Sequence, residues 1–336
     1  MHNMGRNGYV VLPALTEEEV ANARAGLHKS LSTVGVDVNN LEATAPNIRY
    51  AGNGVGGIVE MYYQEWKLAL HQHPKLFGTV AALWNATYAS GKTPGYETPL
   101  GSFDPSRGYI YIDRAGFRIP DRIIQMYPVE DRAQPLQFGV HPHFDCDPLA
   151  LWGAAARAET TGMAPRWRPL QAFVSLTDSL IGNEGGFEAV PGFHKHFEEY
   201  FRQRPWGQNN HEFYSLVPGA HDDVLSMFRH IDVQAGDIVV WDWRLAHSNA
   251  HKHTGDGTRE VVYLGYLPDV HLNHDYAEEQ ADKYKHGEAP PDFSRAPLIE
   301  PSPAFNFTSL GYRLMGLVNC TKVKKKKNKV KKVDDK

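Results

Sequence analysis

The sequence has few of the features that mark secreted, membrane-spanning or nucleotide-hydrolysing proteins. Its two cysteines, Cys146 and Cys320, are too few for a disulfide framework. No apolar run approaches the roughly 18 residues that a membrane-spanning helix needs, and the opening MHNMGRNGYVVLP lacks the charged and apolar regions of a signal peptide. A Walker-type glycine loop, a GxSxG motif and an internal repeat are also missing. We therefore expect an intracellular protein, cytoplasmic or nuclear, with no membrane span, and neither a P-loop hydrolase nor a serine hydrolase.

The net charge of −4 conceals an acidic body and a basic tail. The last sixteen residues, TKVKKKKNKVKKVDDK, contain nine Lys and two Asp, about +7, so residues 1–320 carry about −11. A lysine tract without aromatic side chains cannot bury enough apolar surface to offset chain entropy, so we expect residues 319–336 to be disordered. Such a tail can contact nucleic acid, anionic lipid or import machinery, or only keep the chain soluble.

The first third of the chain has helical patterns. Thr16 and Glu19 form a capping box after the apolar run GYVVLP. Four apolar residues then recur at helical spacing: Val20, Ala23, Leu27 and Leu31. A second helical pattern covers residues 60–85 and predicts a break at Pro74.

From about residue 108 the pattern changes to short β-type runs separated by Gly, Pro and Asp. These runs are GYIYID, RIIQMYP, LQFGVHP, LQAFVSLTD, GFEAVPG, HIDVQ, DIVVWDW and EVVYLGYLP. Most of them have no regular helix in between, although FHKHFEEYFRQRP is a helical insertion. The pattern therefore predicts a mainly β fold with flanking helices, either an antiparallel barrel or a double-sheet jelly roll.

The stretch GVHPHFDCD at residues 139–147 has the side chains of a metal site. Side chains two residues apart lie on one face of a strand, which permits His141 with His143, His143 with Asp145, or Asp145 with Asp147. Alternation alone does not choose among these pairs, and it turns Cys146 away from Asp145. Two histidines and one carboxylate would leave open coordination positions on Fe(II) for a cosubstrate and dioxygen.

A third ligand and a cosubstrate anchor follow later in the chain. His247 ends the β-type run GDIVVWDWRLAH, and His251 and His253 share its parity as rivals. Arg259 supplies a bidentate fork for a dicarboxylate at the start of the next run. A tight hairpin would hold Arg259 roughly 23 Å from His247 at ~3.3 Å per residue, so we expect residues 250–258 to form an open loop.

An ordered set of motifs resembles the phytanoyl-CoA dioxygenase family of Fe(II)- and 2-oxoglutarate-dependent oxygenases. The set runs from GYVVLPALTEEEVANARAGL through HFD at 143–145 and NEGGFEAVPGFHK to GDIVVWDWRLAHSN, and Arg259 follows twelve residues after His247. The resemblance covers about residues 8–270.

The resemblance implies a fold and a set of site residues. The fold is a double-stranded β-helix, of the jelly-roll or cupin-like kind, with His143, Asp145 and His247 as iron ligands. Arg259 would bind the distal carboxylate of 2-oxoglutarate, and a polar residue on a nearby strand would assist it. The candidates for that role are Gln125, Thr177 and Ser248. The carboxylate at Asp145 favours hydroxylation or a related oxidation over halogenation.

The implied domain organisation and reaction are as follows. Residues 1–318 form a single oxygenase domain, with a helical support at about 1–105, the β-helix at about 106–272 and a C-terminal extension at 273–318. Dioxygen and 2-oxoglutarate would oxidise an unactivated C–H of a small molecule, with release of succinate and CO2. The substrate is not transferable from the family, because the segments 85–120 and 149–169 are longer than its core requires.

Other interpretations of the same residues stay open. In a dinuclear zinc hydrolase of the metallo-β-lactamase type, His141, His143 and Asp145 would all be ligands, although Cys146 stands where that motif has a further histidine. A non-catalytic binding protein on an oxygenase fold is another alternative. Four arginines, which are Arg107, Arg114, Arg118 and Arg122, could recognise an anionic substrate, but a solvated basic face is the favoured interpretation.

Overall fold

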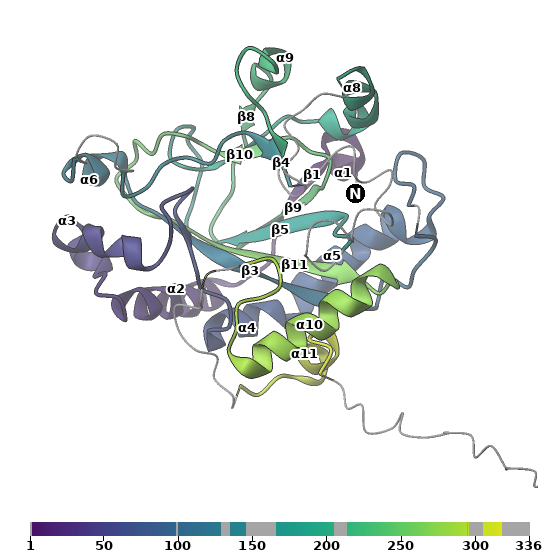
Figure 1. The fold of residues 1–336 in the computed structure, drawn as a ribbon, viewed down its shortest axis with the longest axis horizontal. Coiled ribbons are helices and arrows are strands. Elements are labelled where there is room, and N and C mark those ends of the chain that lie inside the picture. The colour runs from purple at the N-terminus through teal and green to yellow at the C-terminus, as the bar shows by residue number, and fades with distance from the viewer. Residues whose placement is uncertain are drawn as a thin grey trace, which may run out of the picture.

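The protein is built from two antiparallel β-sheets and a set of helices. The computed structural model describes residues 2–98, 100–128, 135–145, 166–204, 214–293, 295 and 305–317. Side chains from both sheets share one apolar cluster, and most of the longer helices lie below the larger sheet in Figure 1. The two sheets confirm the predicted antiparallel strands, but the content is a mixture of helix and strand rather than mainly β. Cys146, Asp147 and residues 319–336 lie outside the described residues.

The larger sheet has the strand order β1-β9-β5-β11-β3-β2. Its strands are β1 (Tyr9–Pro13), β2 (Ile58–Val59), β3 (Gly108–Arg118), β5 (Leu170–Ser175), β9 (Asp237–Asp242) and β11 (Arg259–Pro268). The smaller sheet has the order β7-β4-β10-β6-β8. Its strands are β4 (His143–Phe144), β6 (Phe187–Ala189), β7 (Tyr214–Ser215), β8 (Arg229–His230) and β10 (His247–Asn249). The chain crosses between the sheets repeatedly, and this brings β4 and β10 together although they are far apart in sequence.

Alternation along the central strands divides the core into two layers. Val174, Val240 and Leu264 face the helices and belong to the cluster under the larger sheet. Phe173 and Trp241, one position away on the same strands, face the smaller sheet. The central strands are therefore buried on both faces, as expected for runs with few polar residues.

The helices follow the local signals closely. They are α1 (His2–Asn7), α2 (Glu17–Ser32), α3 (Leu41–Thr44), α4 (Glu65–His71), α5 (Pro74–Ala86), α6 (Asp121–Gln125), α8 (Phe197–Gln203), α9 (Asp222–Leu225), α10 (Leu272–His286) and α11 (Ser309–Leu314). The Thr16 hydroxyl accepts the amide N–H of Glu19, and the Glu19 carboxylate accepts that of Thr16, which confirms the capping box. The predicted break occurs between α4 and α5, where Pro74 occupies the first turn of α5.

Two predicted strands are wrong. RIIQMYP forms α6 and the turn after it, because the Asp121 amide donates to the His253 carbonyl and the Asp121 carboxylate accepts the His253 amide. LQFGVHP has only an isolated bridge between Phe138 and Val55. Of the helices in the described part of the chain, none is both long and apolar enough to cross a bilayer.

Candidate metal centre

Three of the predicted side chains converge where β4 and β10 pair. His143 and His247 are direct partners in the antiparallel register, and Asp145 follows β4. One Asp145 oxygen lies 3.2 Å from His143 Nε2 and the other lies 3.5 Å from His247 Nε2. Their potential ligand atoms all lie within 4.8 Å of one another, and the described residues hold no other such cluster. We refer to these three residues as the triad.

Backbone carbonyls orient both imidazoles of the triad. His143 Nδ1 lies 2.7 Å from the His141 carbonyl oxygen, and His247 Nδ1 lies 2.9 Å from that of Leu245. Because a carbonyl oxygen can only accept, each Nδ1 donates its proton to that carbonyl, which leaves Nε2, on the side of Asp145, as the atom that can bind a metal once it is unprotonated. Second hydrogen bonds of this kind fix the tautomer and the ring orientation of metal-binding histidines.

The charge states of the triad also suit a cation. Burial raises the pKa of Asp145, but His143 and His247 outweigh it and hold that pKa well below its usual value. Burial, followed by the effect of His143, lowers the pKa of His247. A carboxylate and neutral imidazole at neutral pH are the forms that bind metals. Two nitrogen donors and one oxygen donor fit a divalent iron or zinc ion.

The triad forms part of the wall of a cavity of about 380 Å³. Its other walls come from both sheets and from the segment before β2. Aromatic and aliphatic side chains provide the apolar surface, while two arginines, one further carboxylate and three amides provide much of the polar surface. The aromatic residues are Phe138, Phe187, Trp241 and Tyr263, and the polar ones are Arg114, Arg168, Asp113, Asn53, Gln171 and Asn249.

Asn249 and Ser248 both line this cavity, but their side chains have different partners. Asn249 lies two residues after His247 on β10, and its amide donates to the Tyr263 hydroxyl at 2.9 Å. The Ser248 hydroxyl instead donates to Glu188 at 3.4 Å, across the neighbouring strand. Counting in steps of two from His247 would have identified Asn249 from the sequence.

Arg259 is buried on the face of β11 that meets the smaller sheet. It is 3% exposed and its guanidinium lies 5.4 Å from the centre of the Phe173 ring, which packs on Phe187 and Trp241 of the cavity wall. Its Nη2 has no hydrogen-bond partner, and no described carboxylate forms an ion pair with it. The preceding segment is an open loop, as expected, since β10 and β11 belong to different sheets. Arg259 is not itself among the described residues that line the cavity.

Gln125 and Thr177 lie elsewhere. Gln125 is exposed at the end of α6, so the strand that was to present it does not exist. The Thr177 hydroxyl accepts the Glu260 amide N–H at 3.0 Å and lines a separate surface hollow beside Arg24. Neither residue faces the triad.

The sequence did not indicate which polar residues lie beside Arg259. Arg118 is the direct partner of Arg259 on β3, is also 3% exposed, and pairs with Asp121 at 2.8 Å. Its Nε and Nη1 have no partner, nor does either ring nitrogen of buried His253. Burial and the charge of Arg118 lower the pKa of His253 to about 4, so His253 is neutral and adds no positive charge beside Arg118.

The four candidate arginines divide into two pairs. Arg107 and Arg122 are 65% and 53% exposed, which agrees with a solvated basic face; Arg107 pairs with the largely buried Asp269 and Arg122 with the exposed Glu42. Arg114 lines the cavity of the triad, and Arg118 is buried beside Arg259. For these two residues the solvated-face interpretation is wrong.

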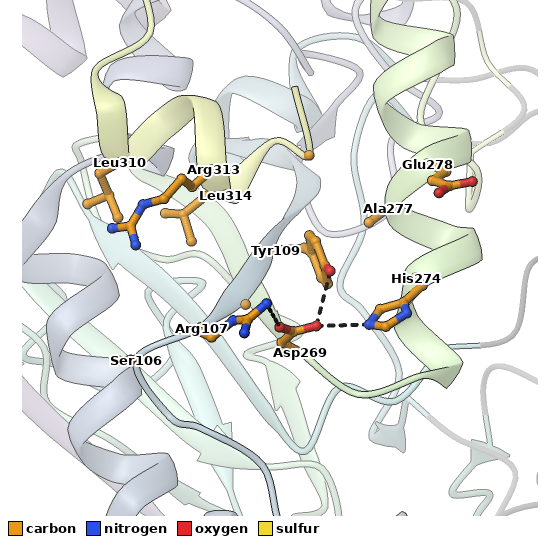
Figure 2. Close-up of a pocket in the computed structure, with 12 residues that line it drawn as sticks. Ser106, Arg107, Tyr109, Asp269, His274, Ala277, Glu278, Leu310, Arg313 and Leu314 are labelled. Atoms are coloured by element: carbon orange, nitrogen blue, oxygen red, sulfur yellow. Dashed lines mark hydrogen bonds and ion pairs between the residues drawn. The ribbon is translucent and has the colours of Figure 1, made fainter. Parts of the chain in front are cut away.

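A second pocket, of about 420 Å³, is centred on a carboxylate whose hydrogen-bonding capacity is already used. Figure 2 shows Asp269 between Arg107, Tyr109 and His274. These donors lie 2.7, 3.1 and 2.8 Å from its oxygens. Such a satisfied network anchors the start of α10 to the start of β3, and it leaves the triad as the better candidate for chemistry.

Comparisons with known proteins support the fold. The profile of one family, described as Gig2-like, matches residues 154–303, which include His247 and Arg259 but not His143 or Asp145. This family is not the phytanoyl-CoA dioxygenase family that the motifs resemble. No curated protein matches the chain.

Solved structures match over most of the chain. A hypothetical protein from Escherichia coli is 18% identical with a TM-score of 0.67, over 93% of this chain and 80% of that chain. A putative oxidoreductase from Salmonella typhimurium LT2 is 16% identical with a TM-score of 0.69, over 93% and 81%. GlcNAc Inducible Gene 2 from Candida albicans is 15% identical with a TM-score of 0.68, over 94% and 75%. At these identities the similarity concerns the fold alone.

Proposed function

We propose that the chain is a non-haem Fe(II)- and 2-oxoglutarate-dependent dioxygenase that hydroxylates, or otherwise oxidises, a C–H bond of a small molecule. The observation that carries this proposal is the triad, in which two imidazole Nε2 atoms and one carboxylate converge at a cavity wall. Three ligands on one side of an ion leave the other side open for a cosubstrate and dioxygen. A structural metal site would instead use all its positions for protein ligands.

The architecture is compatible with this proposal. From β3 to β11 the chain passes back and forth between the two sheets, and we interpret this as a double-stranded β-helix. The HFD motif ends β4 and His247 begins β10, the positions that the resemblance to the phytanoyl-CoA dioxygenase family implies.

The reaction balances without a further reductant. Iron, 2-oxoglutarate and dioxygen together would convert R–H into R–OH while 2-oxoglutarate becomes succinate and CO2. One oxygen atom enters succinate and the other enters the product, and the four electrons that dioxygen takes up come in equal parts from 2-oxoglutarate and from R–H. The chain would contribute His143, Asp145 and His247 to hold the metal, and the cavity would hold the cosubstrate and substrate beside it.

Arg259 is the residue best suited to the distal carboxylate of 2-oxoglutarate. A buried guanidinium without a carboxylate partner is costly unless an anion binds to it. Arg118 beside it uses one N–H bond toward Asp121 and leaves two nitrogens unpartnered, so it would reinforce the same anion site. Tyr263, which follows Arg259 on β11, lines the cavity together with its hydrogen-bond partner Asn249.

Metal binding separates this proposal from the zinc hydrolase. We expect one Fe(II) or Co(II) ion per chain, loss of that ion in His143→Ala, and retention of it in the matched variant His141→Ala, because His141 orients His143 only through its backbone carbonyl. Metal content and Co(II) absorption would be measured on the folded variants. Two zinc ions per chain, with one of them lost in His141→Ala, would refute the oxygenase.

Cosubstrate binding tests the second half of the proposal. Anaerobic addition of 2-oxoglutarate to the Fe(II)-loaded protein should produce a visible metal-to-ligand charge-transfer band. Removing one partner of a buried charge pair costs roughly 2–5 kcal/mol, so Arg259→Gln should weaken 2-oxoglutarate binding about thirtyfold or more while iron still binds. The exposed Arg122→Gln is the matched control and should titrate like the wild type. Equal affinity in Arg259→Gln and the wild type would exclude Arg259 as the anchor.

A further inference from the structure

Two arginines of the triad cavity are held in fixed orientations by aromatic rings. The Arg168 guanidinium lies 4.1 Å from the centre of the Tyr111 ring, and that of Arg114 lies 4.6 Å from the centre of the Phe293 ring. Stacking fixes the plane of a guanidinium and leaves its N–H edge free for a planar or tetrahedral anion. Both arginines line the cavity and neither is strongly exposed, so their forks are pre-organised before any ligand arrives.

The carboxylate between these arginines does not satisfy them. Asp113 lies 3.4 Å from Arg114 Nε and 3.7 Å from Arg168 Nη1, and the remaining oxygen near Arg168 is that of Asp145 at 3.8 Å. Charge-assisted N–H···O bonds are normally about 2.7–2.9 Å long, so neither fork is used fully. Asp113 offsets one of the two positive charges that line this part of the cavity, and Asp145 belongs to the metal. Buried Glu60 also acts electrostatically on Arg114, but its carboxylate accepts the Tyr62 hydroxyl and forms no ion pair with the Arg114 fork among the described contacts.

The position of the arginines relates them to the chemistry. Arg168 approaches the Asp145 carboxylate to 3.8 Å, so an anion held by its outer edge lies within a few bond lengths of the triad. Gln171, three residues further along the chain on β5, is 2% exposed and its Oε1 has no partner, which adds a hydrogen-bond acceptor to the same wall. The distal carboxylate of 2-oxoglutarate has its own cation in Arg259, so Arg114 and Arg168 remain for another ligand.

We propose that the primary substrate is a small molecule with a carboxylate or phosphate group, which Arg114 and Arg168 bind so that a carbon near the anionic group faces the triad. The inference rests on the proposed function for the reaction, but the anion site itself does not depend on it. A cavity of about 380 Å³ is near the small end of the usual range for ligand sites, roughly 300–1,000 Å³, and it must also admit 2-oxoglutarate. The substrate is therefore small.

Binding of simple anions tests the proposal directly. The probes are propionate and inorganic phosphate, with uncharged propionamide as the control, added anaerobically to protein saturated with Fe(II) and 2-oxoglutarate. We expect at least one of the two anions to perturb the charge-transfer band and propionamide to leave it unchanged. Whichever anion binds identifies the group as a carboxylate or a phosphate.

Variants assign the binding to the arginines. Arg114→Gln and Arg168→Gln should weaken anion binding tenfold or more, whereas Arg107→Gln, which alters an exposed arginine outside the cavity, should leave it unchanged. Arg114→Lys keeps the charge but loses the fork, and should fall in between. Thermal melting of each variant, with and without the anion, checks that it is folded.

The results separate this inference from the proposed function. No anion binding to wild type, or equal binding to wild type and Arg114→Gln, overturns the inference. Loss of 2-oxoglutarate affinity in Arg114→Gln also overturns it, because the arginine would then serve the cosubstrate. If the charge-transfer band never forms but anions still stabilise the wild type and not Arg114→Gln against heat, the oxygenase fails and the anion site stands.

Discussion

Glu260 provides the sharpest test of how the start of β11 is held. Its side chain is 1% exposed and points away from the triad, since Arg259 on the preceding position points inward. Arg24 of α2 donates two hydrogen bonds to it at 2.9 and 3.2 Å, and His28 and Thr258 approach one oxygen to 2.9 and 2.7 Å. We expect Glu260→Gln to destabilise the protein, because the isosteric amide keeps the volume but loses the charge.

The size of the effect follows from the pKa of Glu260. Burial raises that pKa, but the bonds from His28, Arg24 and Thr258 outweigh it and lower it from 4.5 to about 2. At about 1.4 kcal/mol per pKa unit, this difference corresponds to roughly 3 kcal/mol as an upper value. Arg24 is 41% exposed and solvent screens its share, so we expect about 2–3 kcal/mol at pH 7.

The pH dependence has a defined sign. The folded-state pKa is depressed, so the stabilisation is complete above about pH 4.5 and is lost as the pH falls toward 2. The difference between wild type and Glu260→Gln should therefore shrink by roughly 1 kcal/mol between pH 7 and pH 3.5, because protonated Glu resembles Gln. Urea unfolding at pH 7, 5, 4 and 3.5 measures this difference. The reasoning would be refuted if the difference in unfolding free energy between the two proteins stayed constant over that range, or if Glu260→Gln were as stable as the wild type at pH 7.

Three other substitutions, one of them with a matched control, test particular contacts. Asn249→Ala should weaken 2-oxoglutarate binding to the iron-loaded protein severalfold, because the Asn249 amide is bonded to Tyr263 of the cavity wall. Ser248→Ala should leave the anaerobic titration unchanged, because the Ser248 hydroxyl is bonded to Glu188. Gly57→Ala should lower the free energy of unfolding in urea by about 1–3 kcal/mol, since Gly57 has φ +72 and a Cβ there would lie 2.7 Å from the Arg118 Cα. If this variant is as stable as the wild type, the backbone at Gly57 can shift to accept a side chain and the reasoning is wrong. Burial lowers the pKa of Lys67 from 10.5 in the unfolded chain to about 7 in the folded protein. Between pH 7 and pH 10 the unfolded state therefore binds more protons than the folded state, and the folded state is favoured as the pH rises. The wild type should gain stability relative to Lys67→Met over this range. Parallel pH–stability curves for these two proteins would contradict a buried, neutral lysine.

Local signals in the sequence were sufficient for the helices. The capping box of Thr16 and Glu19 satisfies backbone groups within four residues of each other, so no distant contact could override it. Pro74 likewise begins α5, because its ring fixes φ near the helical value and the first turn does not need its missing N–H. By contrast, the run after Ile119 is short and apolar, and its conformation is set by hydrogen bonds between Asp121 and His253, which no local pattern shows.

Strand alternation narrowed the candidate site without fixing it, because it left three pairs open within GVHPHFDCD. His143, Asp145 and His247 were the set that the resemblance to the phytanoyl-CoA dioxygenase family implied, and the structure brings these three together. Asn249 follows from alternation counted onward from His247. The partnership of Arg118 with Arg259 could not be predicted, because it depends on the register of β3 against β11 across more than a hundred residues.

The pairing of β4 with β10 has a consequence for how the chain folds. These strands are only two and three residues long, and their facing histidines are separated by the whole segment from 143 to 247. An ion on the triad would act as a cross-link that closes a loop of roughly 100 residues. By the chain-entropy argument that applies to disulfides, such a cross-link removes about 4–5 kcal/mol of unfolded-chain entropy. Metal loading would then be a late event in folding, and loss of the ion would first release the short strand that carries His143.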